Sequence, residues 1–426
     1  MTKPIPVSTQ ITSLTGLRAI AAGMVFFYHW LFDTPQSWSL VPRAIVAHGY
    51  LGVAIFFALS GFLITVRYRD ALRNASGERR ISYGNYLLKR FVRIYPLYLF
   101  VFLVFVALPG RPLGFAPDSS LRYFVGLTLT QAFFPPLLLS GVSTAWTLTI
   151  EELFYFFAPG LMRLLSGSTA RICGCAFLVA VVSIGMAWGL SRMNPVVPDF
   201  IFGAPLTYLF THSIFGRLPD FLVGMVAGVL FLRRRMAITP ALPHKSEFTG
   251  EGNAAPSPVP TPIPMGGEGW GGGLAVYVCA ALLLLSIVAC ELAAPLQSPA
   301  LSRLAEFLVA CSSAALIFSL ACDVTHTNLL SRLLGSRLVA YLGKISYALY
   351  LIQLTEPCQW LYYVGIQLQY KNLTGGELGR VPNALALYLA ATLISMALYH
   401  LVEMPAQRGL SRLAKLYVPG TGDQNR

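Results

Sequence analysis

Long apolar runs separated by short polar segments dominate the hydropathy pattern of this chain. A run of about 20 apolar residues is long enough for a helix to cross a bilayer. Such runs occupy residues 14–33, 50–66, 91–108, 146–165, 172–190, 218–233, 274–292, 302–322, 339–355 and 383–402. The pattern predicts an all-α fold, a polytopic integral-membrane bundle of about ten transmembrane helices.

Two further stretches are weaker candidates for spans. Pro135 and Pro136 interrupt residues 121–139, and residues 357–369 are amphipathic. Proline inside a helix removes a backbone hydrogen bond, and irregular backbone is tolerated at membrane depth only where protein or water covers it. We expect both stretches to be interfacial or re-entrant. The first apolar run has no small-residue cleavage site, so we expect it to be retained rather than removed as a signal peptide.

The distribution of basic residues predicts the orientation of the chain in the membrane, because Lys and Arg favour cytoplasmic loops. With ten spans and a cytoplasmic N-terminus, most of the basic residues fall inside. The main clusters are Arg67, Arg69, Arg73, Arg79, Arg80, Lys89, Arg90 and Arg93 around the loop after the second span, and Arg233, Arg234 and Arg235 after the sixth. We therefore expect cytoplasmic N- and C-termini and a multi-pass protein of the bacterial inner membrane.

Composition agrees with a membrane protein, since 55% of the residues are hydrophobic and only 12% are charged. This excludes a single soluble core. Basic loops and their attraction to anionic lipids account for the net charge of +13, so we expect no nucleic acid partner. The seven cysteines and six histidines show no zinc spacing, and we predict neither a metal site nor disulfides.

One membrane domain is expected over residues 1–426. Residues 238–273 are rich in Pro, Gly and Ser and cannot bury a core, which predicts a flexible cytoplasmic linker. Residues 406–426 are expected to form a cytoplasmic tail. No other hydrophilic block has the size of a soluble domain.

Two ionisable side chains lie inside the first apolar run. Arg18 and His29 are eleven residues apart, so a helix places them on one face about 16 Å apart along its axis. A lone buried histidine is more often structural, and an arginine can extend to the lipid head groups. Ionisable groups inside a membrane are nevertheless candidates for function, and the shared face indicates the two ends of one path.

Other apolar segments also contain specific polar residues. Arg90 and Arg93 share a helical face where the third span leaves the cytosol, and either a donor phosphate or lipid head groups would suit them. Glu151 and Glu152 lie at the outer end of the fourth span. The helix N-terminus favours carboxylates, and for Glu152 this structural role is sufficient.

Two further apolar segments contain polar residues, one at an expected helix contact and one at a helix end. Ser60 lies among small residues that allow close helix approach in the second span, and packing alone could explain it. Arg217 and Asp220 lie at the outer end of the sixth span. We expect them to form an ion pair that fixes this helix end.

Seven motifs follow one another over residues 14–405: LTGLRAIAAGMVFFYH, GYLGVAIFFALSGFLIT, LLKRFVRIYPLY, AWTLTIEELFY, RLPDFLVGM, LGKISYALYLI and LVEMP. In this order they resemble the recurring blocks of acyltransferase family 3, a family of integral-membrane enzymes. The resemblance implies acyl transfer, commonly acetyl from acetyl-CoA, onto a hydroxyl of a sugar, glycolipid, polysaccharide precursor or macrolide. It implies an acyl-CoA co-substrate and no permanently bound cofactor. Supporting residues within these motifs are Ser60, Trp146, Glu152, Tyr155, Arg217, Asp220, Ser346, Tyr347 and Glu403.

The chain departs from the family pattern at two positions. Ala54 stands where the second block often has aspartate, and Gln353 stands where the late block often ends in histidine. These departures leave open a contribution of the two positions to acceptor binding. They also leave room for a non-catalytic relative that binds or exports a polysaccharide.

A catalytic hypothesis follows for the first helix. Arg18, together with Arg90 and Arg93, would hold the phosphates of acyl-CoA arriving from the cytosol, because guanidinium groups bind phosphate oxygens bidentately. A pantetheine arm would bridge the helical rise of about 16 Å to His29. A neutral His29 would then take the acceptor proton as general base. Glu151 would orient His29 or balance the imidazolium.

A transporter is the alternative from a different class. Ten helices with intramembrane charges also suit a secondary transporter or a flippase of a lipid-linked or acylated sugar. Such proteins often carry an internal repeat, and none is visible in this sequence. The outer segments specify no acceptor, since Trp and Tyr there are ordinarily interfacial anchors.

Overall fold

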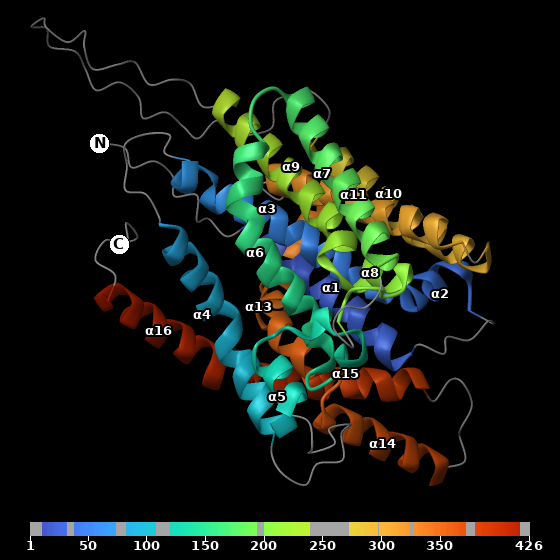
Figure 1. The fold of residues 1–426 in the computed structure, drawn as a ribbon. Coiled ribbons are helices and arrows are strands. Elements are labelled where there is room, and N and C mark those ends of the chain that lie inside the picture. The colour runs from blue at the N-terminus through green and yellow to red at the C-terminus, as the bar shows by residue number, and fades with distance from the viewer. Residues whose placement is uncertain are drawn as a thin grey trace, which may run out of the picture.

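A computed structural model describes residues 11–31, 38–73, 82–107, 120–193, 200–238, 272–296, 298–323, 328–371 and 380–417. These residues form helices joined by turns, and no strand occurs among them. Figure 1 shows the long helices gathered in one bundle. The prediction of an all-α helix bundle is confirmed.

Each predicted apolar run overlaps one long helix. These are α1 (Thr12–Trp30), α3 (Gly52–Arg73), α4 (Tyr83–Phe102), α6 (Trp146–Leu164), α7 (Thr169–Ser191), α9 (Ile214–Ile238), α10 (Gly272–Ala293), α11 (Pro299–Cys322), α13 (Arg337–Ile352) and α15 (Arg380–Leu398). The shorter helices are α2 (Leu40–Ala47), α5 (Ser120–Leu127), α8 (Leu206–His212), α12 (Leu329–Gly335), α14 (Glu356–Lys371) and α16 (Met404–Tyr417).

Six segments of the described residues are long and apolar enough to cross a membrane, and α13 with α14 would make a seventh if the bent pair is one span. The six lie at Gly49–Arg69, Thr169–Ser191, Leu206–Met236, Leu274–Leu296, Leu301–Cys322 and Arg380–Arg412. The helices α1, α4 and α6 fall outside this set. The chain is thus a multi-pass membrane protein, while the count of ten and the cytoplasmic termini stay predictions.

The two weaker stretches do not form straight spans. Helix α5 ends at Leu127, and only three-residue 3₁₀ turns follow at Gln131–Phe133 and Pro135–Leu137. Helix α14 bends by 87° from α13. Most of the predicted linker, residues 239–271, lies outside the described residues. The first part of the predicted tail lies in helix α16, which packs against α4 (Figure 1).

Glycines permit the closest helix contacts of the bundle. A Cβ at Gly343 in α13 would lie 1.8 Å from the Thr15 carbonyl oxygen in α1, and one at Gly224 in α9 would lie 2.0 Å from the Ala58 carbonyl oxygen in α3. Any larger residue at these positions would push the helices apart. The main core, including Phe26, lies among α1, α3, α4, α6, α9 and α13.

The substitution Gly343→Ala tests the α1 and α13 contact. We expect it to destabilise the fold by about 1–3 kcal/mol, because the added methyl group overpacks a closed interface. The midpoint of thermal unfolding in detergent would report this loss. Gly160→Ala is the matched control, since a Cβ there meets no atom within 4 Å and alanine is favoured over glycine in helices. An equal effect of both substitutions would contradict the prediction.

Candidate active site

A funnel of two adjoining cavities opens into the bundle. The wide cavity has a volume of about 540 Å³ and the narrow one about 80 Å³. The two are adjacent because they share the lining residues Arg18, Arg90, Arg93, Glu151, Tyr155 and Tyr347. These shared residues come from α1, α4, α6 and α13, and α3 adds further lining residues, so the funnel lies where these helices meet.

The wide cavity is strongly cationic. Its lining contains the basic residues Arg18, Arg67, Lys89, Arg90, Arg93 and Lys344. Two carboxylates, Glu151 and Glu403, oppose these six cations in the lining. Clustered cations in a cleft attract anionic ligands and raise their local concentration. The cavity is therefore suited to a compound carrying several phosphates.

Two arginines keep donor atoms available for such a ligand. Arg90 is buried, donates a hydrogen bond to the Tyr68 hydroxyl at 2.6 Å, and lies over the rings of Tyr68 and Tyr155 at 4.9 and 5.5 Å. These contacts hold its position, but its Nε has no hydrogen-bond partner among the described residues. The Nε of Arg18 is likewise buried without a partner there. The structure thus brings together the three predicted donor-binding arginines, including Arg93.

Glu151 lies on the wall shared by both cavities. It accepts hydrogen bonds from the Ser60 hydroxyl at 3.3 Å and from the Tyr155 hydroxyl, which is four residues further along α6. The i, i+4 spacing places Tyr155 on the same helical face as Glu151, and the contact with Ser60 joins α3 to α6. Three residues singled out from the sequence therefore form one polar cluster.

His29 lies in the last turn of α1. Its Nδ1 is 2.8 Å from the Val25 carbonyl oxygen. A carbonyl oxygen can only accept, so Nδ1 carries the proton and Nε2 of the neutral ring keeps its lone pair. The fixed tautomer leaves His29 a nitrogen capable of acting as a base.

His29 and Glu151 are not in contact in the described structure. His29 does not line either cavity of the funnel, and the hydrogen bonds of Glu151 go to Ser60 and Tyr155. The Val25 carbonyl, which sequence analysis did not identify, orients the imidazole instead. No residue pattern could mark this group, because every residue has a backbone carbonyl.

The remaining supporting residues occupy several places. Ser346 lines the narrow cavity and donates to the Gly343 carbonyl at 2.9 Å, while Tyr347 lines both cavities and donates to the Ile94 carbonyl at 2.7 Å. Glu403 lines the wide cavity. Trp146 and Glu152 line neither cavity, and the Trp146 ring packs edge-on against His212 at 4.6 Å between ring centres.

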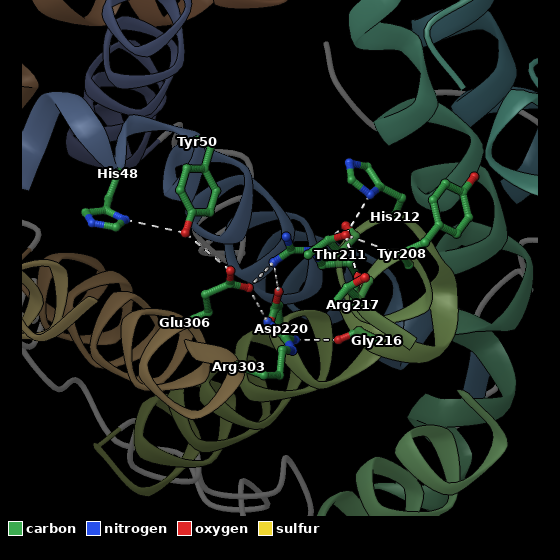
Figure 2. A network of polar contacts seen from close by, with 11 residues as sticks. His48, Tyr50, Tyr208, Thr211, His212, Gly216, Arg217, Asp220, Arg303 and Glu306 are labelled. Atoms are coloured by element: carbon green, nitrogen blue, oxygen red, sulfur yellow. Dashed lines mark hydrogen bonds and ion pairs between the residues drawn. The ribbon is translucent and has the colours of Figure 1, made fainter. Parts of the chain in front are cut away.

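Figure 2 shows a buried charge cluster, whose four charged residues line neither cavity of the funnel. Arg217 contacts Asp220 at 3.2 Å, as the sequence predicts. Arg303 and Glu306 of α11 complete the cluster: Arg303 lies 3.0 Å from both Asp220 and Glu306, and Arg217 lies 3.4 Å from Glu306. Sequence analysis missed Arg303 and Glu306, although their three-residue spacing inside an apolar run is the same signal.

The two departures from the family pattern are both buried. Ala54 packs inside the bundle, where an aspartate would need a polar partner. Gln353 follows the end of α13 beside His29. Its side chain is fully buried and interacts with the His29 ring.

Metal and disulfide chemistry can be examined for the described residues. No group of three His, Cys, Asp or Glu side chains there could hold a metal ion, and all seven cysteines are free thiols.

Residues 11–400 match a family described as an acyltransferase domain. Among curated relatives, acyltransferase MdmB of Streptomyces mycarofaciens is 29% identical over 53% of this chain and 58% of its own length. The putative peptidoglycan O-acetyltransferase YrhL of Bacillus subtilis is 32% identical over 41% of this chain and 28% of its own. Peptidoglycan O-acetyltransferase OatA of Listeria monocytogenes is 28% identical over 36% and 24%, respectively.

These matches cover only part of each relative's length. The chain spans less than two thirds of the length of each of the three proteins. No solved structure matches it.

Proposed function

Because this chain belongs to the acyltransferase 3 family of membrane O-acyltransferases, we propose that it transfers acetyl from acetyl-CoA to a hydroxyl of a cell-envelope or exported carbohydrate. The observation that carries this proposal is the cationic funnel lined by Arg18, Arg90 and Arg93. The names of YrhL and OatA support a carbohydrate acceptor and acetyl as the acyl group.

The charge of the funnel suits the phosphates of the donor, and the rise of α1 from Arg18 to His29 suits the length of its pantetheine arm. Arg18, Arg90 and Arg93 bind the phosphates in the wide cavity, since charge-assisted bonds to phosphate are strong and directional. The pantetheine arm follows the face of α1. This route delivers the thioester close to His29, about 16 Å along the helix from Arg18.

His29 acts as general base in this proposal. Its Nε2 accepts the proton of the acceptor hydroxyl while the oxygen attacks the thioester carbonyl carbon. The C–S bond then breaks, the new ester leaves with the acceptor, and the thiolate of CoA takes the proton back from the imidazolium. The hydrogen bond from Nδ1 to the Val25 carbonyl supports this role, because it keeps Nε2 available.

Glu151 acts on the donor side of the reaction. Its position among Arg18, Ser60 and Tyr155 supports a role in shaping the donor channel and balancing its arginines. We therefore assign the orientation of His29 to the Val25 carbonyl and keep Glu151 as a residue that touches the donor.

A labelled-donor experiment tests the proposed function. Inside-out vesicles containing the protein receive acetyl-labelled acetyl-CoA and an extract of glycolipid and polysaccharide. We expect label in an alkali-labile ester, made by the intact protein. Absence of both transfer and donor binding would contradict the proposal and favour the transporter alternative.

The substitution Arg18→Met tests donor binding. A lost hydrogen bond to a charged partner costs about 1.5–3 kcal/mol, so we expect the KM for acetyl-CoA to rise about 10- to 150-fold. Initial rates at saturating acceptor measure it. Arg192→Met is the control, because Arg192 is exposed and stacks on Trp188 outside the funnel. An unchanged KM in Arg18→Met would remove this residue from the donor site.

A further inference from the structure

Helix α16 and the residue before it contribute a polar stripe to the wide cavity. Glu403, Gln407 and Ser411 are spaced four residues apart, so a helix places them on one face. All three line the cavity. Helix α16 packs against α4 (Figure 1), and its residues Gln407 and Ser411 form part of the cavity wall.

One atom of this stripe has an unused hydrogen-bonding capacity. The Gln407 amide nitrogen is 3.1 Å from Glu403 Oε1 and 3.4 Å from the Arg93 carbonyl oxygen. The other carboxylate oxygen, Glu403 Oε2, is buried and has no hydrogen-bond partner among the described residues. Buried polar atoms nearly always have a partner. The missing partner of Oε2 therefore points to a ligand in the cavity that Glu403 lines.

The chemistry of the missing group follows from the carboxylate. A carboxylate oxygen accepts hydrogen bonds, so the ligand must present a hydroxyl or an amine to it. The cations of the same cavity favour phosphates. A nucleotide carries phosphates next to hydroxyl and amine donors, and the aromatic faces of Tyr68, Tyr347 and Tyr399 in the cavity lining suit its base.

We propose that Glu403, held by Gln407, recognises the nucleoside part of the acyl donor through a ribose hydroxyl or the adenine amine. This inference rests on the proposed function and deepens it. The site then selects a nucleotide-bearing thioester, acyl-CoA, over a phosphopantetheine thioester that lacks the nucleotide. Glu403 is a specificity-determining residue in the donor site and takes no part in bond making.

A simpler role for Glu403 predicts the opposite effect of its substitution on donor binding. Glu403 lies within electrostatic range of Arg18 and Arg93, so it could serve only as their counter-ion. Removing its charge would then strengthen the binding of every phosphate-bearing donor. If Glu403 binds the nucleoside, removing its charge weakens the binding of only those donors that carry the nucleotide.

The test uses the full chain, purified in lipid nanodiscs, with two donors. Acetyl-CoA and S-acetyl-4′-phosphopantetheine differ by the nucleotide, so their KM values isolate its contribution. For Glu403→Gln we expect the KM for acetyl-CoA to rise about 10-fold or more and that for the phosphopantetheine donor to stay constant. Gln407→Leu should show the same pattern more weakly. Gln359→Leu is the matched control, since Gln359 is exposed on α14 outside the cavity.

Several results would overturn the inference. For Glu403→Gln, these are lower KM values for both donors, equal increases of KM for both, or no change of KM for either. An intact protein that uses both donors equally well would also overturn the inference. Calorimetry with CoA and 4′-phosphopantetheine supplies a readout independent of turnover. If no acetyl is transferred but Glu403→Gln weakens only CoA binding, the nucleoside site stands and the proposed function fails.

Discussion

Replacing His29 with alanine is expected to lower the rate of acyl transfer about 10²- to 10⁴-fold, the usual contribution of a general base. The reason is the geometry of the last turn of α1. The Nδ1 bond to the Val25 carbonyl reserves Nε2 for the acceptor proton. Single-turnover transfer of labelled acetyl to the acceptor measures the loss.

Donor binding is the internal control for this variant. CoA affinity should stay within about twofold of the intact protein, because His29 lies outside both cavities that hold the arginines. Added imidazole should restore part of the rate, since it supplies the missing base to the space left by the ring. His212→Ala serves as a second control, because the His212 ring stacks on Tyr208. Full transfer by His29→Ala would exclude the proposed base.

Replacing Asp220 with alanine is expected to destabilise the fold by about 3–5 kcal/mol, the effect of removing one partner of a buried ion pair. Asp220 is completely buried between Arg217 and Arg303, at 3.2 and 3.0 Å (Figure 2). Its loss leaves two buried guanidinium groups facing the single carboxylate of Glu306. The midpoint of thermal unfolding in detergent, and the yield of folded protein, would report this change.

A second substitution separates charge balance from packing. In the double variant Asp220→Ala with Arg303→Met, the remaining pair of Arg217 and Glu306, 3.4 Å apart, is neutral. We expect the double variant to be more stable than Asp220→Ala alone, because no uncompensated charge stays buried. If the two losses simply add, charge balance is not the cause.

Local sequence determined the helices of this protein. Each of the ten apolar runs overlaps one long helix, because an apolar segment inside a membrane satisfies its backbone hydrogen bonds by forming a helix. The consecutive Pro135 and Pro136 likewise disfavour a long helix after α5, because neither has a backbone N–H donor. The funnel arginines and Glu151 were also found, since ionisable residues in apolar surroundings are conspicuous in the sequence itself.

Only tertiary structure decided which groups meet. Three features depend on which helices pack side by side: the partners of Glu151, the second half of the charge cluster at Arg303 and Glu306, and the place of Glu403 in the wide cavity. Helical periodicity gives the residues that share a face, but it says nothing of the helix that this face meets. The Val25 carbonyl, which accepts the hydrogen bond from His29 Nδ1, could not be predicted for a related reason. A backbone carbonyl has no sequence signature. The sequence thus determined the helices and most of the candidate site residues, while the contacts between distant helices decided which of these residues come together.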